Sequence, residues 1–484
     1  MAITLEDFRA AFKGDITGPQ DHDYARLVTR WSPNEESRPL LIVEPLTESD
    51  VSWAVRYATS NKFEIAVNSG GHSFMGATSS NAGVTIDLRR MKQVYVENEH
   101  FGADGVLHLQ GGVLVGEVAA ACVARGVITS IPAHKDLSYA GWSVGAGAGW
   151  SMGKYGFAID SWLSARVVLA SGEAVTASPE ENPDLFWALK GAGYNFGIIT
   201  SLQVRVESCP HRIFFGLLCF RPSEFEALFA ATATYAKTQQ DEDTMAIIYT
   251  TQDGQGRPKE TMLAILYYQG SDEAEARRRF KPILDLPHIA LRCGLEWFHA
   301  ACDMVEPTMP RTRRYADGTL FAHISLDAWK PAIAKMRNWV GTDPTRRLAT
   351  EFFFGIYNWR STFARHGDPR FESAYPIRDK LPPGGEPSWR DFALYISTNK
   401  LEDEEEAISV CREVVSLVRE KQEEYLGVKK GYQWPVYPNG ALLPGVLGSY
   451  VFQEHYPRLR EVKTKYDRRN IFHKKHPIEP LQIS

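Results

Sequence analysis

A histidine directly behind two glycines is the first feature of the chain that could do chemistry. His72 follows Gly70 and Gly71 in the stretch VNSGGHS, residues 67–73, just after an apolar run. Adjacent glycines permit positive φ and remove the side chains that would shield their surroundings. Such a turn can press its backbone against a flat ligand and present an imidazole beside it. A strand-ending turn with a surface histidine is the alternative that this heptapeptide leaves open.

Two further glycine clusters lie within the next 130 residues. The first, 141–149, reads GWSVGAGAG, and the second, 191–200, reads GAGYNFGIIT. The first has GxGxG spacing and never GxGxxG ahead of a helix, which excludes the dinucleotide fingerprint of a Rossmann fold. The second would expose several backbone N–H groups in one loop, as in anion-binding nests suited to a pyrophosphate. Ordinary tight turns explain either cluster alone, but three glycine-rich loops in one block favour a ligand site.

Short strands and helices must hold these loops over the first 200 residues. The pattern predicts a helix over 49–58 capped by Thr47 and another over 114–125 ended by Gly126. The first of these helices lies between two predicted strands, which is the start of a βαβ unit. The predicted strands are 40–43, 64–67, 83–88, 94–96, 106–110 and 165–170.

From about residue 206 the predicted elements become longer. The segment 402–425 opens with five acids, which suit a helix N-terminus, and continues with apolar residues at helical spacing. An antiparallel sheet backed by helices fits the whole block. Its other predicted helices are 223–238 and 271–283, and its predicted strands are 213–220, 245–249 and 262–268.

Composition narrows the class of protein. A chain of 484 residues exceeds the size of one hydrophobic core, so two or more domains are expected. The net charge of -5 offers no basic excess to neutralise the phosphates of a nucleic acid. The six cysteines form no close pair and no CxxC, so we expect no metal site and no dense disulfide framework. With an acidic start unlike a signal peptide and no stretch of 18 apolar residues, a cytoplasmic protein without a membrane partner is expected.

Several stretches, read together, resemble one family, the berberine-bridge-enzyme-like flavoproteins of the vanillyl-alcohol-oxidase superfamily. The resemblance implies an α+β protein with a PCMH-type FAD-binding domain over residues 1–205, completed by 447–484. A substrate-binding domain of antiparallel sheet backed by helices, residues 206–446, is expected to be inserted between these segments. The stretches that carry the resemblance follow the family's order and are 68–73, 83–88, 182–191, 196–200 and 456–472.

In this family the histidine of the GGHS turn is bonded through its ring to the 8α-methyl group of FAD, which implies that bond at His72. Many relatives add a second bond from a cysteine, whose counterpart here lies at or near His134. No cysteine lies in that loop, residues 131–137, so the resemblance implies FAD attached through His72 only. A leucine three residues on, here Leu137, is typical of members that react slowly with dioxygen. The residues expected at the cofactor are Ser69, Gly70, Gly71, His72, Ser73, Asp136, Leu137, Tyr139, Gly141, Trp142, Gly145, Gly147, Gly193, Phe196, Gly197, Ile198, Ile199 and Asn470.

The resemblance also implies catalytic residues later in the chain. The family's Asn-Tyr-x-Asp motif, whose tyrosine helps to remove a substrate proton, is reduced here to Val-Tyr-Pro-Asn and keeps only Tyr437. A phenol with a solution pKa of about 10 needs a nearby cation, or the flavin, to act near neutral pH. We therefore expect Arg378, His134 or Lys400 to assist it. A packing role for Tyr437 and a plain loop role for His134 stay open.

The resemblance thus implies a FAD-linked oxidase or dehydrogenase. A hydride would pass from an alcohol or amine carbon of a small organic substrate to FAD, and dioxygen or another acceptor would reoxidise the flavin. The twelve tryptophans and the missing secretion signal favour an aromatic secondary metabolite over a carbohydrate. The degenerate tyrosine motif motivates a second hypothesis, a flavin-bearing cyclase or scaffold without net redox chemistry. A binding module without flavin is the third, and His72 with the two glycine loops argues against it.

Overall fold

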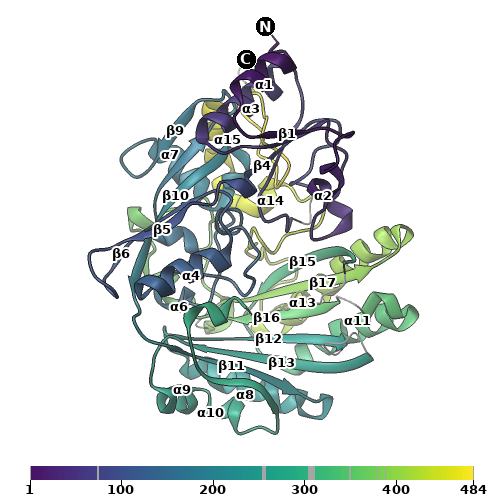
Figure 1. The fold of residues 1–484 in the computed structure, drawn as a ribbon. Coiled ribbons are helices and arrows are strands. Elements are labelled where there is room, and N and C mark those ends of the chain that lie inside the picture. Colours follow the sequence, from purple (N-terminus) through teal and green to yellow (C-terminus); the bar gives the residue numbers. More distant parts are fainter. Residues whose placement is uncertain are drawn as a thin grey trace.

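Three β-sheets organise the part of the chain that the structure describes (Figure 1). A computed structural model describes residues 2–73, 76–252, 258–303, 311–347, 350–378, 380–386 and 388–482. Both termini lie together at the top of Figure 1, and the largest sheet lies in its lower half. The termini therefore belong to the part of the molecule that carries the first two sheets.

The first sheet, in the order β1-β2-β4-β3, carries the turn with His72. Strand β4 pairs in parallel with both β2 and β3, and β1 pairs with β2 antiparallel. Thr47 caps α3 and forms a capping box with Asp50, as predicted. Because α3 connects β2 to β3 and both strands run parallel to β4, the predicted βαβ start is confirmed. Strand β3 ends immediately before the 69–73 turn. The elements are α1 (Leu5–Ala11), β1 (Asp15–Thr17), α2 (Tyr24–Val28), β2 (Leu41–Glu44), α3 (Glu48–Ser60), β3 (Ile65–Asn68) and β4 (Val84–Asp87).

The second sheet is antiparallel, in the order β5-β6-β10-β8-β9, with β7 pairing to β10. Helix α4 ends at Gly126, as its sequence predicts, in the left-handed conformation. The first glycine cluster begins inside α5, and the second begins at the end of α7 and runs into the start of β10. The elements are β5 (Val94–Glu97), β6 (Gly105–Gln110), α4 (Val115–Arg125), β7 (Val127–Ile128), α5 (Tyr139–Ser143), α6 (Met152–Tyr155), β8 (Trp162–Val168), β9 (Ala174–Ala177), α7 (Pro183–Ala192) and β10 (Ile198–Ser208).

The third sheet has seven antiparallel strands in the order β14-β11-β13-β12-β16-β17-β15. The helix predicted over 271–283 is two helices, because Pro282 fits only the first turn of a new one. The strands are β11 (Ile213–Phe220), β12 (Asp243–Gln252), β13 (Pro258–Tyr268), β14 (Ile289–Glu296), β15 (Arg313–Phe321), β16 (Glu351–Ile356) and β17 (Arg390–Thr398). The helices are α8 (Phe225–Thr238), α9 (Glu273–Arg279), α10 (Lys281–Leu284), α11 (Lys330–Thr342), α12 (Arg360–Ala364) and α13 (Glu404–Leu426).

The two faces of this sheet serve different cores. Along β13, Ala264 and Leu266 pack in a cluster with the helices of the third sheet, whereas Ile265 and Tyr267 pack in the core shared with the second sheet. Alternation along a strand explains this division. The face that carries Ile265 and Tyr267 is turned toward the second sheet. Side chains on this face can therefore form a site together with residues of the first half of the chain.

The C-terminal segment returns to the first half of the chain. Its helices are α14 (Gly448–Phe452) and α15 (Tyr456–Tyr466). The buried ammonium of Lys463 donates to Asp467 at 2.7 Å and to the carbonyl of Asn195 at 2.7 Å, in the loop before β10. Because of these contacts we propose that residues 1–205 and 447–484 form one domain and 206–446 the other.

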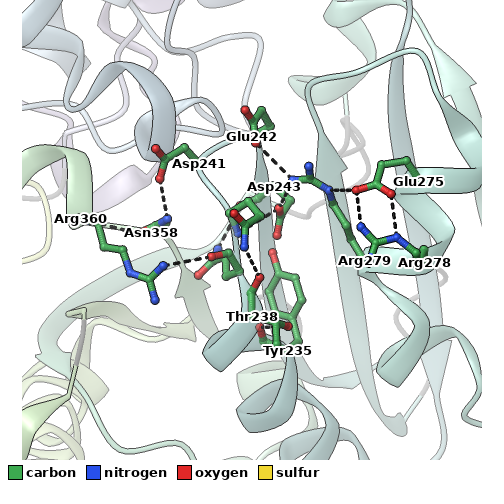
Figure 2. Close-up of polar contacts among 12 residues, drawn as sticks. Tyr235, Thr238, Asp241, Glu242, Asp243, Glu275, Arg278, Arg279, Asn358 and Arg360 are labelled. Atoms are coloured by element: carbon green, nitrogen blue, oxygen red, sulfur yellow. Dashed lines mark hydrogen bonds and ion pairs between the residues drawn. The ribbon is translucent and has the colours of Figure 1, made fainter.

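A buried acid anchors the loop between α8 and β12 (Figure 2). Asp243 has a side chain only 1% exposed, and Arg279 of α9 donates to its carboxylate at 2.7 Å. Arg279 also bonds Glu275 at 2.8 Å, while Arg278 bonds the same Glu275 from the solvent side. The network ties α9 to the start of β12.

Replacing Arg279 with leucine is expected to lower the free energy of unfolding by about 3 kcal/mol, because an uncompensated carboxylate is left buried. The matched control is R278L, which removes an exposed arginine from the same Glu275 and should leave the free energy of unfolding unchanged. Urea unfolding of both variants and of R279L/D243N, in which the buried charge is also removed, checks the assignment. A double variant as unstable as R279L would show that the unpaired charge is not the cause.

Candidate active site

A cavity of about 440 Å³ lies where the three sheets meet. Its walls combine the 69–73 turn, both glycine loops, the C-terminal tail and the inner face of the third sheet. Many residues that the sequence analysis expects at a cofactor or in catalysis line it. They are Ser69, Gly70, Gly71, His72, Ser73, His134, Leu137, Gly141, Trp142, Gly193, Gly197, Ile198, Ile199 and Tyr437.

Each of the two glycines in the turn is required for a different structural reason. Gly71 adopts a φ of 72°, which favours glycine. At Gly70 a Cβ atom would lie 2.7 Å from the backbone nitrogen of Ser138, so only glycine lets the turn lie against the 136–138 segment. Ser69 fixes the turn by donating to the carbonyl of Gly111 at 3.0 Å. The turn therefore holds His72 at the cavity wall.

His72 is a neutral imidazole. Burial, with smaller contributions from His134 and Arg314, lowers its pKa to about 3. The ring of His134 lies 6.5 Å away, and burial lowers the pKa of His134 to about 4. Both rings are uncharged near neutral pH, so each keeps a nitrogen lone pair available for bonding.

Six of the residues expected at the cofactor lie outside the cavity lining. Asp136 is exposed, and Asn470 donates to Glu479 at 3.0 Å on the surface. The others, Tyr139, Gly145, Gly147 and Phe196, are buried where the glycine loops pack against their neighbours. These four residues support the glycine loops through packing and do not line the cavity.

Of the expected helpers of Tyr437, the structure places His134 in the cavity lining but not Arg378 or Lys400. Arg378 does not line the cavity, because its guanidinium pairs with buried Asp160 and donates to Ser373 at 3.0 Å. Lys400 lies half exposed and pairs with Asp343 at 2.7 Å. Both cations are paired with carboxylates and neither lines the cavity, so we propose no catalytic role for them. His134 lines the cavity, but it is neutral.

Tyr437 lies in the cavity wall with its hydroxyl oxygen accepting two hydrogen bonds. The backbone N–H of Ala148 donates to it at 2.8 Å and the amide of Asn439 donates at 3.4 Å. Burial is the largest cause of a pKa raised above the usual value of 10. The oxygen is thus occupied as an acceptor, and the phenol keeps its own hydrogen as a donor.

Two carboxyl groups that line the cavity were not expected there from the sequence. Asp391 of β17 and Glu351 of β16 line it, with Tyr395 two strand repeats along from Asp391 on the same face. Burial raises the pKa of Asp391 to about 7, and it raises the pKa of Glu351 to about 7 against the opposing effect of Arg314. The available signal was an acid in an apolar strand, since buried acids are rare. A carboxylate with such a pKa suits proton transfer near neutral pH.

A buried lysine from the tail is the third missed feature. Lys475 lines the cavity, donates to Asn439 at 3.2 Å and lies 4.1 Å from the centre of the Tyr194 ring. Burial lowers its pKa to about 7. The amine places a hydrogen-bond donor in the cavity wall, ready for an electron-rich group of a ligand.

These residues fit FAD, which needs a flat slot for its ring system and donors for its pyrophosphate. Glycines of the 69–73 turn, of the 141–149 cluster and of the 191–200 cluster line the cavity. Within the described residues, the buried Asn68 Oδ1 and Thr78 Oγ1 have no hydrogen-bond partner, and both side chains line the cavity. Buried polar atoms without partners indicate a missing polar ligand.

Comparison with known proteins agrees with this geometry. Residues 39–178 match the family model of a FAD binding domain, and residues 444–479 match the model described as berberine and berberine like. A FAD-linked oxidoreductase of Aspergillus terreus, pgmH, is 27% identical over 98% of this chain and 96% of its own. The (R)-6-hydroxynicotine oxidase of Paenarthrobacter nicotinovorans is 32% identical over 45% of this chain, and the match spans about half of that relative, 46%.

Solved structures share the fold along nearly the whole chain. The 6-hydroxy-D-nicotine oxidase from Arthrobacter nicotinovorans has a TM-score of 0.77 and 21% identity, covering 97% of this chain and 98% of that one. A glucooligosaccharide oxidase from Acremonium strictum, described with a 6-S-cysteinyl, 8α-N1-histidyl FAD, has a TM-score of 0.77 and 20% identity over 98% and 99%.

Fold, matched domains and cavity together define a FAD-dependent oxidoreductase with a PCMH-type FAD-binding domain. The chain thus carries a FAD binding domain and, near its C-terminus, a berberine and berberine like domain, and it shares its fold with the solved oxidases named above. The expected α+β fold class is confirmed. Within the ranges given above, no helix has the length and apolar character needed to cross a bilayer.

Proposed function

We propose that the protein removes a hydride from an alcohol or amine carbon of a small organic substrate, and that FAD is covalently attached through His72 alone. The observation that carries the proposal is a neutral imidazole on a glycine turn, at the wall of a cavity that also contains two buried carboxyl groups. No cysteine is among the residues found to line the cavity, which supports a single attachment. When bound, FAD supplies the hydride acceptor.

The chain's own groups divide the remaining work. The O–H of Tyr437 donates a hydrogen bond to the reacting oxygen or nitrogen and orients it. The carboxylate of Asp391 accepts the proton from that atom at a side-chain oxygen, because its pKa of about 7 leaves it largely ionised just above neutrality. The neutral imidazole of His134 offers the substrate a further contact in the cavity wall. Leu137, also in the wall, narrows the approach of dioxygen, so we propose slow reoxidation by dioxygen and another acceptor in its place.

The cavity wall also favours a class of substrate. The inner face of the third sheet presents an apolar surface from four neighbouring strands, made of Leu217, Ile248, Leu263, Ile265 and Phe353. Oligosaccharides need many hydrogen bonds, whereas an apolar wall with a few polar groups suits an aromatic or aliphatic body with one reacting centre. We therefore place an apolar or aromatic secondary metabolite ahead of a carbohydrate.

Two measurements test the proposal. Acid precipitation of the purified protein should keep the yellow colour in the pellet, and peptide mapping should find the flavin on His72. Anaerobic mixing with a panel of aromatic alcohols, apolar amines and oligosaccharides should bleach the flavin with members of the first two groups. Colour released into the supernatant would refute the covalent link, and a panel without any bleaching would refute the oxidoreductase reaction.

The surroundings of Tyr437 favour a second candidate function, that of a cyclase or scaffold that holds flavin without net redox chemistry. The phenol has a raised pKa, and neither Arg378 nor Lys400, the two cations expected to activate it, lines the cavity. In that case sulfite should form no adduct with the bound flavin and no substrate should bleach it. An adduct together with bleaching favours the oxidoreductase.

A further inference from the structure

The imidazole of His72 stacks on an indole from a distant part of the chain. The ring centres of Trp31 and His72 are 5.2 Å apart and the rings are inclined by only 24°. The backbone N–H of Trp31 also donates to the carbonyl of Gly71 at 3.2 Å, inside the glycine turn. Trp31 thus contacts both the ring of His72 and the turn that carries it.

A cation from the third sheet holds the indole. The guanidinium of Arg314, on β15, lies 3.6 Å from the centre of the Trp31 ring, and its residue is only 2% exposed. A cation at this distance over a tryptophan is attracted by the ring, most strongly where water is excluded. The contact therefore connects the substrate-binding half of the chain to the histidine of the other half.

Backbone contacts keep the two partners in register. Ser32 accepts from the backbone N–H of Arg314 at 3.1 Å, and Asn34 donates to the carbonyl of Arg314 at 2.8 Å. Next to Trp31, Arg30 donates to the carbonyl of Thr78 at 3.1 Å, behind the turn. The segment 30–34 is thereby fixed at both ends of the Arg314–Trp31–His72 stack.

Attachment of a flavin at His72 makes strict demands on the imidazole. The C–N bond forms as the ring loses its N–H proton and the 8α-methyl group loses one hydrogen, and the two electrons released reduce the flavin, which dioxygen reoxidises with formation of hydrogen peroxide. The nitrogen must therefore be neutral and aimed at the methyl carbon. Small errors in such an alignment reduce rates by orders of magnitude.

We propose that Trp31 and Arg314 are positioning residues for the attachment of FAD at His72: the indole fixes the plane of the imidazole, and the guanidinium fixes the indole. The inference rests on the proposed covalent link at His72. Its consequence is that the flavin becomes attached efficiently only when β15 is docked against the turn. The nearby cation also opposes protonation of His72, which keeps the ring nitrogen reactive.

The test measures attached flavin as a fraction of all flavin bound, from absorbance before acid precipitation and fluorescence of the pellet after it. W31L and R314L should bind FAD yet retain about one tenth of the wild-type fraction. W31F preserves an aromatic face and should stay near the wild-type fraction, and R314K preserves a cation and should recover much of the loss. Because the readout is a ratio, a variant that binds less FAD overall is still scored.

The matched control is R458L, which breaks a similar contact away from the cavity. Arg458 lies 3.9 Å from the centre of the Trp187 ring, and neither residue lines the cavity. Its fraction of attached flavin should equal that of the wild type. Unchanged fractions in both W31L and R314L, or a fall in R458L as large as theirs, overturn the positioning role. Loss of flavin from the wild-type pellet overturns the covalent link itself, so the two failures are distinguishable.

Discussion

Alanine at position 72 is expected to release all flavin from the acid-precipitated protein and to lower kcat by about 10- to 100-fold, because a ligand without its tether is held less well in the reacting geometry. FAD should still bind, since the glycine loops and the buried Lys475 are untouched. Pellet fluorescence, flavin content of the native protein and turnover of a substrate that bleaches the wild type give the three readouts.

Two other histidines make this result specific. H108A alters a histidine of the second sheet that stacks on Tyr95 and pairs with Glu97, outside this cavity, and should leave both linkage and turnover unchanged. H134A removes the second imidazole of the cavity and should keep the flavin in the pellet. A yellow pellet from H72A that becomes colourless in H72A/H134A would move the attachment point to His134 and contradict the proposal.

Local rules explain why much of the fold could be predicted from the sequence. Thr47 and Gly126 mark helix ends through contacts with residues three or four positions away, so their types alone are informative. The 69–73 turn was predicted for the same reason, because Gly71 meets a backbone requirement that no partner elsewhere creates. The βαβ start and the long helix after residue 402 follow from periodicity within one segment.

The candidate site was harder to predict where partners are far apart in the chain. Arg378 was expected near Tyr437, but its charge is satisfied by Asp160, 218 positions earlier. Conversely, Asp391 reads as one acid in an apolar strand, and alternation cannot tell which face of β17 looks into the cavity. Trp31 gave no signal at all, because its importance comes from His72 and Arg314, both distant in sequence.

Replacing Asp391 with asparagine is expected to lower kcat by about 10²- to 10³-fold if the carboxylate is the general base, since such groups contribute on this scale. The base must be ionised, so wild-type activity should be lost as pH falls through about 7, the pKa that burial gives Asp391, and should be retained above it. In D391N the residual activity should show no such acid limb. Turnover measured from pH 5 to about 9 at matched flavin content separates this effect from loss of cofactor.

Control variants decide which acid is responsible. Asp317 of β15 is half-buried, and burial raises its pKa to about 6, but it does not line the cavity, so D317N should keep both turnover and the acid limb. Glu351 has a pKa near that of Asp391 and does line the cavity, which makes E351Q the sharper comparison. An acid limb that survives in D391N and disappears in E351Q would assign proton removal to Glu351. Because the two carboxyls lie on neighbouring strands of one rigid sheet, that result would move the reacting atom along the wall while leaving the flavin site unchanged.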